Sequence, residues 1–97
     1  MMSDNKKFYI TTPLYYVNDE PHIGHAYTTI LADVISRIHR MNNEDVYFLT
    51  GTDEHGQKVE KAAKKFNLDT KDFVDQMSVK FKDLISFLNC CNNDFIR

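Results

Sequence analysis

Two histidines, His22 and His25, flank the glycine of the stretch PHIGH, directly after Pro21. At the beginning of a helix, a spacing of three places both imidazoles on one side of the first turn. A helix start also leaves backbone N–H groups unpaired and carries partial positive charge, so it receives phosphate readily. Gly24 removes a side chain and lets a flat ring or a phosphate approach the backbone. This pattern favours a phosphate-binding helix start, although histidines also occur at such positions without any ligand.

Two other kinds of site fit the sequence less well. A zinc site needs further ligands, but the remaining candidates lie on other elements without the paired spacing of a zinc module: His39, His55, Cys90 and Cys91. The glycine patterns of dinucleotide-binding folds and of P-loops are absent from the sequence. We therefore expect no metal ligands in this segment.

A second polar stretch, TGTDEHG, covers residues 50–56. It carries Asp53 and Glu54 between Gly51 and Gly56. A carboxylate in this position could hold a substrate ammonium through charge-assisted hydrogen bonds. The alternative is a polar turn whose acidic residues cap the next helix.

The elements that must position these residues follow from hydrophobic spacing. Aromatic and β-branched runs predict strands over residues 6–12 and 46–50. Apolar residues at helical spacing predict a helix from about residue 22 to 41, and a lysine-rich helix over 57–66. A last helix follows a cap at Asp69 or Thr70. Two strands joined by a long helix predict an α/β fold with parallel strands, in the order strand, helix, strand, helix, helix.

Glycine and proline, the residues that interrupt helices and strands, are expected to lie together. All three glycines and both prolines are predicted to fall in loops just beyond the carboxyl ends of the two strands. Ligands of open α/β sheets bind at that edge. The aromatic residues at positions 8, 9, 47 and 48 are expected to form core.

The composition limits the class of protein. Of the 97 residues, 42% are hydrophobic and 27% are charged, and the net charge is −2. These values predict one small globular domain and give no electrostatic case for bulk binding of nucleic acid. The apolar run of a signal peptide or of a membrane span is missing, and the two cysteines are adjacent. We therefore expect a soluble, cytoplasmic chain without membrane partners.

Three motifs together carry a resemblance to a known family. The stretch PHIGH matches the histidine signature of class I aminoacyl-tRNA synthetases, and TTPLYYVN and FLTGTDEHGQK are more restrictive. From about Phe8 to Arg97 the chain resembles the methionyl-tRNA synthetases of that class. The resemblance implies that residues 1–97 form the amino-terminal half of a Rossmann-like catalytic domain.

The resemblance also implies an activity and a set of site residues. The complete enzyme would use ATP with Mg²⁺ to convert methionine to methionyl-adenylate, and would transfer the methionyl group to tRNA(Met). His22 and His25 match the histidines that stabilise the phosphates in the transition state, and Gly24 matches a glycine that lies against adenine. The positions that match methionine-binding residues are Leu14, Tyr16 and, for the ammonium group, Asp53.

Some family features have no counterpart in these 97 residues. The connective insertion, which often carries zinc, the lysine-rich signature loop and the anticodon-binding domain lie beyond Arg97 in the family. We therefore expect zinc only in that further part, and no tRNA charging by the 97 residues without the remainder of the catalytic domain. Asp19 is a smaller departure, since relatives often have glycine there. Two alternatives remain open: another nucleotidyltransferase with an H-x-G-H helix start, and a truncated, non-catalytic chain.

Overall fold

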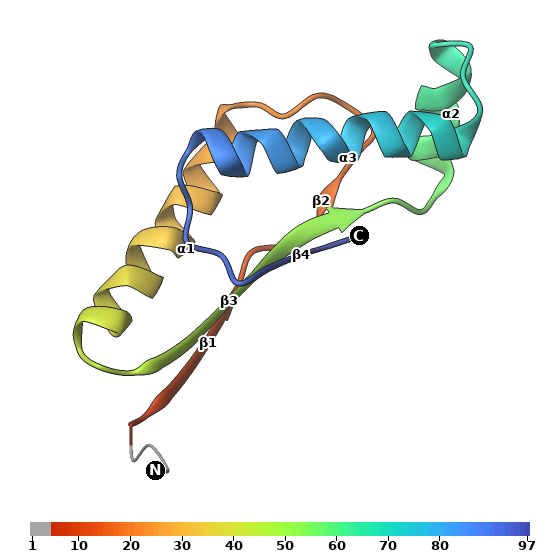
Figure 1. Ribbon diagram of the computed structural model, residues 1–97. Coiled ribbons are helices and arrows are strands. Elements are labelled where there is room, and N and C mark those ends of the chain that lie inside the picture. Colours follow the sequence, from red (N-terminus) through yellow and green to blue (C-terminus); the bar gives the residue numbers. More distant parts are fainter. Residues whose placement is uncertain (1–4) are drawn as a thin grey trace.

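The computed structural model describes residues 5–97 as a parallel sheet with helices on one side (Figure 1). The elements in chain order are β1 (Lys7–Thr11), β2 (Tyr15–Tyr16), α1 (Ile23–Met41), β3 (Asp45–Asp53), α2 (Gln57–Lys65), α3 (Thr70–Phe87) and β4 (Asp94–Ile96). The predicted α/β class, the parallel pairing of the two main strands and the order of the helices are confirmed. The short strands β2 and β4 were not predicted.

Strand β3 is the centre of the sheet, because β1, β2 and β4 all pair with it in parallel. The Leu49 carbonyl accepts from the backbone N–H of Thr12 at 3.2 Å, whereas the Phe48 carbonyl accepts from that of Asn93 at 2.7 Å. Consecutive carbonyls of a strand point to opposite edges, so β1 and β4 flank β3 on its two sides.

Gly51 lies inside β3, so its predicted place in a loop is wrong. The strand is longer than expected because β2 and β4 pair with its second half and continue the ladder through Asp53. A Cβ atom at Gly51 would lie 2.0 Å from the carbonyl oxygen of Ile96. The glycine is therefore needed for the close approach of β4. Gly56 does lie in a loop, with φ of 108° at the beginning of α2.

The predicted aromatic core of the two main strands is only partly correct. Phe48 is fully buried and Phe8 is half-buried, but Tyr9 and Tyr47 are 61% and 45% exposed. Successive side chains of a strand point to opposite faces, so the two tyrosines share the face without helices. The main core lies instead between β2, α2 and α3 and contains Tyr15, Val17, Val59, Ala63, Phe73, Val74, Met77 and Phe81.

Helix α1 packs on the sheet through a side made of small and polar residues. Its buried residues are Thr29, Ala32, Asp33 and Ser36. The apolar residues that predicted the helix lie largely on its exposed side, where Ile30, Leu31, Val34, Ile38 and Met41 are 43% to 81% exposed. We call these five residues the apolar stripe of α1.

The three helices of residues 5–97 end in the same way. Asn43, Asn67 and Asn89 adopt left-handed backbone conformations, with φ of 60°, 58° and 55°. The residue after each asparagine donates its N–H to a carbonyl in the last helical turn, as Leu68 does to Ala63 at 3.0 Å. This is the Schellman arrangement, in which asparagine takes the position that glycine usually occupies.

Along residues 5–97, no helix combines the length and the apolar character needed to cross a bilayer. Residues 1–4, which begin the stretch inspected for a signal peptide, lie outside the described part of the chain.

Candidate active site

A surface hollow lies between the end of β1, strand β2 and the beginning of α1. It brings together four of the six predicted site residues: Leu14, Tyr16, His22 and His25. Tyr15 is 7% exposed while Tyr16 is 62% exposed, as strand alternation requires. The first tyrosine therefore belongs to the core, and the second is available to a ligand.

His22 and His25 cap α1 for one another. His22 is the N-cap residue, and its Nδ1 accepts the backbone N–H of Gly24 at 3.0 Å. In return, Nδ1 of His25 accepts the backbone N–H of His22 at 3.0 Å. This is a capping box built from two imidazoles instead of the usual hydroxyl and carboxylate. The rings lie 4.0 Å apart between centroids.

The capping box determines which nitrogen atoms can meet a ligand. A neutral imidazole that accepts at Nδ1 carries its proton at Nε2. Each histidine therefore presents one Nε2–H donor and has no free acceptor. The N–H groups of His22 and Gly24 are occupied by the capping box, so these two groups do not fit the expectation of an unpaired helix start.

The packing of the His22 ring favours glycine at position 24. A Cβ atom at this position would lie 2.8 Å from Cε1 and 3.0 Å from Nδ1 of His22. The flat ring that approaches the backbone of Gly24 in this structure is therefore that of His22. A side chain here would displace the ring and break the cap.

The imidazole of His25 is packed on two aromatic rings. Tyr15 and Phe81 meet it edge-on, at centroid distances of 4.8 and 4.9 Å. Burial and the neighbouring imidazole of His22 lower the pKa of His25 below its usual value, against a smaller opposite effect of Asp19. His25 is consequently neutral at neutral pH.

Asp53 is the last residue of β3 and the register partner of Tyr16. Neighbouring strands are about 4.8 Å apart, so Asp53 lies one strand away from a residue of the hollow, without lining it. Its carboxylate is 38% exposed and accepts the backbone N–H of His55 at 3.3 Å.

The adjacent carboxylate, Glu54, is committed to the fold. Arg97 binds both of its oxygens, at 2.7 and 2.8 Å, and Thr52 donates to it at 2.7 Å. The hydrogen bonds from Arg97 lower the pKa of Glu54, and the side chain is only 11% exposed. Of the two acidic residues in TGTDEHG, Asp53 is therefore the one left for a ligand.

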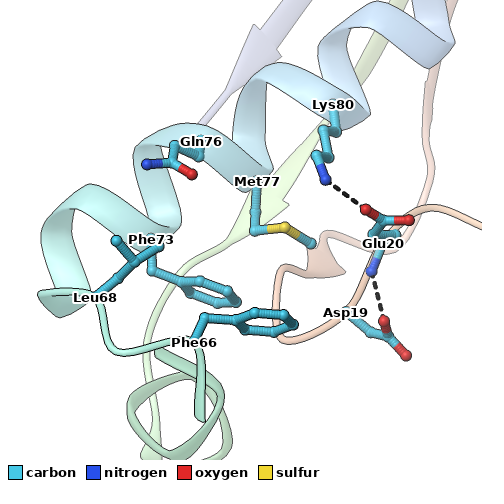
Figure 2. Close-up of a pocket in the computed structure, with 8 residues that line it drawn as sticks. All are labelled: Asp19, Glu20, Phe66, Leu68, Phe73, Gln76, Met77 and Lys80. Carbon is cyan, nitrogen blue, oxygen red and sulfur yellow. Dashed lines mark hydrogen bonds and ion pairs between the residues drawn. The ribbon is translucent and has the colours of Figure 1, made fainter. Parts of the chain in front are cut away.

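A second hollow lies on the other side of the loop that leads into α1, and Figure 2 shows its lining. Its wall is largely apolar, and none of the predicted site residues lines it. The lining residues are Asp19, Glu20, Phe66, Leu68, Phe73, Gln76, Met77 and Lys80. Lys80 forms an ion pair with Glu20 and so ties this loop to α3. Asp19, the departure from the family, accepts the N–H of Glu20 at 2.7 Å.

Residues 5–97 contain no cluster of three histidine, cysteine or acidic side chains that could hold a metal ion. Cys90 and Cys91 are free, and burial raises the pKa of Cys90 to about 11. These thiols are therefore protonated and of low reactivity.

Comparison with known proteins decides the family. A family model described as class I tRNA synthetases (M) matches residues 8–97. The chain belongs to this synthetase family. The methionine–tRNA ligase of Rickettsia conorii is 59% identical over 93 residues, which cover 96% of this chain and 18% of that enzyme. The ligase of Thermotoga maritima is 59% identical over 91 residues, which cover 94% of this chain and 14% of that enzyme.

Solved synthetase structures share the fold. The methionyl-tRNA synthetase of Mycobacterium tuberculosis, in complex with methionyl-adenylate, superposes with a TM-score of 0.93 at 43% identity, covering 95% of this chain and 18% of that one. A leucyl-tRNA synthetase of Agrobacterium radiobacter, solved in a ternary complex, superposes with a TM-score of 0.87 at 27% identity. The match covers 93% of this chain and 11% of that one. The synthetase chain described here thus spans less than a fifth of the length of the relatives it matches.

Proposed function

We propose that this chain is the ATP- and methionine-binding segment of a methionine–tRNA ligase. The observation that carries the proposal is the pair of mutually capped histidines at one hollow with Leu14 and Tyr16. In the complete enzyme the methionine carboxylate would attack the α-phosphorus of ATP, supplied with Mg²⁺. The new oxygen–phosphorus bond gives methionyl-adenylate, and the bond to pyrophosphate breaks. The methionyl group then passes to the terminal adenosine of tRNA(Met), in the cytoplasm.

The two Nε2–H groups suit this chemistry because charge develops on phosphate oxygens and no proton has to move. Neutral imidazoles held by the backbone are preorganised donors, which need no rearrangement when the transition state forms. The adenine would lie against the turn that carries Gly24, as the resemblance implies, beside the His22 ring that packs there.

The methionine side of the site would involve Leu14, Tyr16 and Asp53. The exposed surfaces of Leu14 and Tyr16 offer apolar contact to a thioether side chain. The half-exposed carboxylate of Asp53, in register with Tyr16, would hold the ammonium group. Alignment of the carboxylate with the α-phosphorus is itself a large part of such catalysis.

The complete reaction requires the remainder of the catalytic domain. The apolar stripe of α1 and the exposed pair Tyr9 and Tyr47 are surfaces that a continued polypeptide would cover. We expect the 97 residues alone to give no ATP–pyrophosphate exchange.

The test separates the two sides of the site in the complete enzyme. Replacement of His25 by alanine should lower kcat of ATP–pyrophosphate exchange by roughly a hundredfold, since one preorganised donor contributes about 2.7–4 kcal/mol. Asp53→Asn should instead raise KM for methionine by at least about tenfold. Normal kinetics in both variants would refute the proposal.

A further inference from the structure

The imidazole of His25 packs against side chains from two other elements of the fold. Tyr15 comes from β2 and Phe81 from α3, and they are 7% and 1% exposed. Both rings meet the imidazole edge-on, with interplanar angles of 71° and 82°. The two rings also stack on each other at 5.9 Å and 25°. We call Tyr15 and Phe81 the aromatic socket of His25.

A chain of hydroxyl groups fixes the socket to the backbone of His25. The Thr29 hydroxyl donates to the His25 carbonyl at 2.8 Å, which uses its only proton. The Tyr15 hydroxyl, 2.8 Å from Thr29 Oγ1, is therefore the donor in that contact. Thr29 is fully buried, so this chain is shielded from water.

Helix α3 is tied to the same turn from the other side by the ion pair of Lys80 with Glu20. Phe81 is the next residue along α3. Phe81 is 1% exposed and belongs to the same core cluster as Tyr15, so core packing holds its ring against His25. Edge-to-face aromatic pairs contribute beyond the area they bury, so the socket selects one orientation of the imidazole.

We propose that Tyr15 and Phe81 are positioning residues that hold the Nε2–H of His25 toward the phosphate-binding side of the hollow. This proposal rests on the proposed function, because it assumes that His25 meets the phosphates. It adds that a helix outside the hollow sets the catalytic geometry. The socket acts on the rate of adenylate formation and not on the affinity for ATP.

The test uses Phe81→Leu in the complete enzyme, with Phe73→Leu as the matched control. Phe73 lies on the same helix, is 3% exposed and stacks on Phe66 at 5.8 Å, away from His25. Both variants should lose similar stability in urea. Phe81→Leu should lower the single-turnover rate of adenylate formation about tenfold, which corresponds to about 1.4 kcal/mol, with KM for ATP unchanged within about twofold. Phe73→Leu should keep the wild-type rate.

A double-mutant cycle shows whether the socket acts through His25. In a His25→Ala background, Phe81→Leu should cause no further loss of rate. Tyr15→Phe keeps the ring and removes only the hydroxyl, and it should lower the rate about threefold. This variant replaces Phe81→Leu in the test if Phe81→Leu does not fold. Equal rates in Phe81→Leu and Phe73→Leu, or a full additional loss in the His25→Ala background, would overturn the positioning role. A wild-type rate in His25→Ala itself would instead overturn the proposed function, and the socket with it.

Discussion

His22 and His25 exchange hydrogen bonds across the first turn of α1: each Nδ1 accepts a backbone N–H at 3.0 Å, one from Gly24 and one from His22. The same two residues thus cap the beginning of α1 and leave each Nε2–H outside the capping box. The capping role uses Nδ1 and the proposed donor role uses Nε2, so mutation can separate the two.

His22→Asn separates the two roles. Asparagine is among the best N-cap residues and can accept the Gly24 N–H, but it lacks a donor at the position of Nε2. We expect stability within about 0.5 kcal/mol of the wild type and a loss of adenylation of roughly a hundredfold. His22→Ala should lose the cap as well, at a cost of about 1 kcal/mol. Urea unfolding and ATP–pyrophosphate exchange on the complete enzyme measure both quantities, and a normal exchange rate in His22→Asn would rule out the donor role.

Gly24→Ala is expected to harm activity more than stability. Alanine favours a helix by about 1 kcal/mol over glycine, which offsets the loss of a cap of similar size. The displaced ring of His22 should nevertheless lower the adenylation rate at least tenfold. The same two assays apply. Retention of the wild-type rate would mean that the imidazole can move aside without losing its function.

The lowered pKa of His25 predicts a pH effect with a definite sign. Because the unfolded state binds the proton more tightly, His25 contributes stability above its unfolded value of about 6.5 and loses this contribution as the pH falls through the folded pKa. Burial of the ring and the neighbouring His22 lower this pKa, and Asp19 raises it by a smaller amount. Titration of the His25 Cε1–H signal by NMR should give a midpoint below 6.5, whereas a midpoint above it contradicts the packing described here.

An element could be predicted from the sequence only where its hydrophobic pattern was long enough. The runs around Phe8 and Phe48 and the apolar spacing of α1 were long enough to predict the main elements. Strand β2 has two residues and β4 has three, which is too short for any periodicity, so the full length of β3 and the place of Gly51 were missed.

The predicted spacing of α1 did not indicate which side would be buried. A helix normally buries its apolar side, but here Thr29 and Ser36 face the sheet and the apolar stripe remains exposed. The capping box was missed because its usual signal is a hydroxyl followed by a carboxylate, and histidine Nδ1 gives no such pattern. The alternation of Tyr15 and Tyr16 could have shown which tyrosine is buried.

Arg97 binds Asp75 at 2.6 Å in addition to Glu54, and this ion cluster predicts a second contribution to stability that acid removes. The pKa of Glu54 is lowered by Arg97, so its contribution is present above its unfolded value of 4.5 and is lost as the pH falls through the folded pKa. Since Arg97 is 46% exposed, we expect only about 1 kcal/mol after solvent screening. Glu54→Gln should lower the urea midpoint more at pH 7 than at pH 3, and equal losses at both pH values would exclude an ionic contribution.

The left-handed asparagines predict a contrast between two substitutions. Asn67→Ala should cost about 1–2 kcal/mol, because a Cβ without a compensating polar group disfavours that conformation. Asn67→Gly should be neutral or slightly stabilising. Urea unfolding of the two variants compares them directly, and equal stability would show that the φ of 58° is not required.

The most direct test of the site is a crystal structure of the complete enzyme with a non-hydrolysable methionyl-adenylate analogue, in which the distance from His25 Nε2 to the nearest phosphate oxygen is measured. We predict a hydrogen bond of about 2.7–3.2 Å, with the carboxylate of Asp53 at similar distance from the ammonium group. An analogue bound elsewhere, or one whose phosphate lies more than about 5 Å from Nε2 of both histidines, would contradict the site described here.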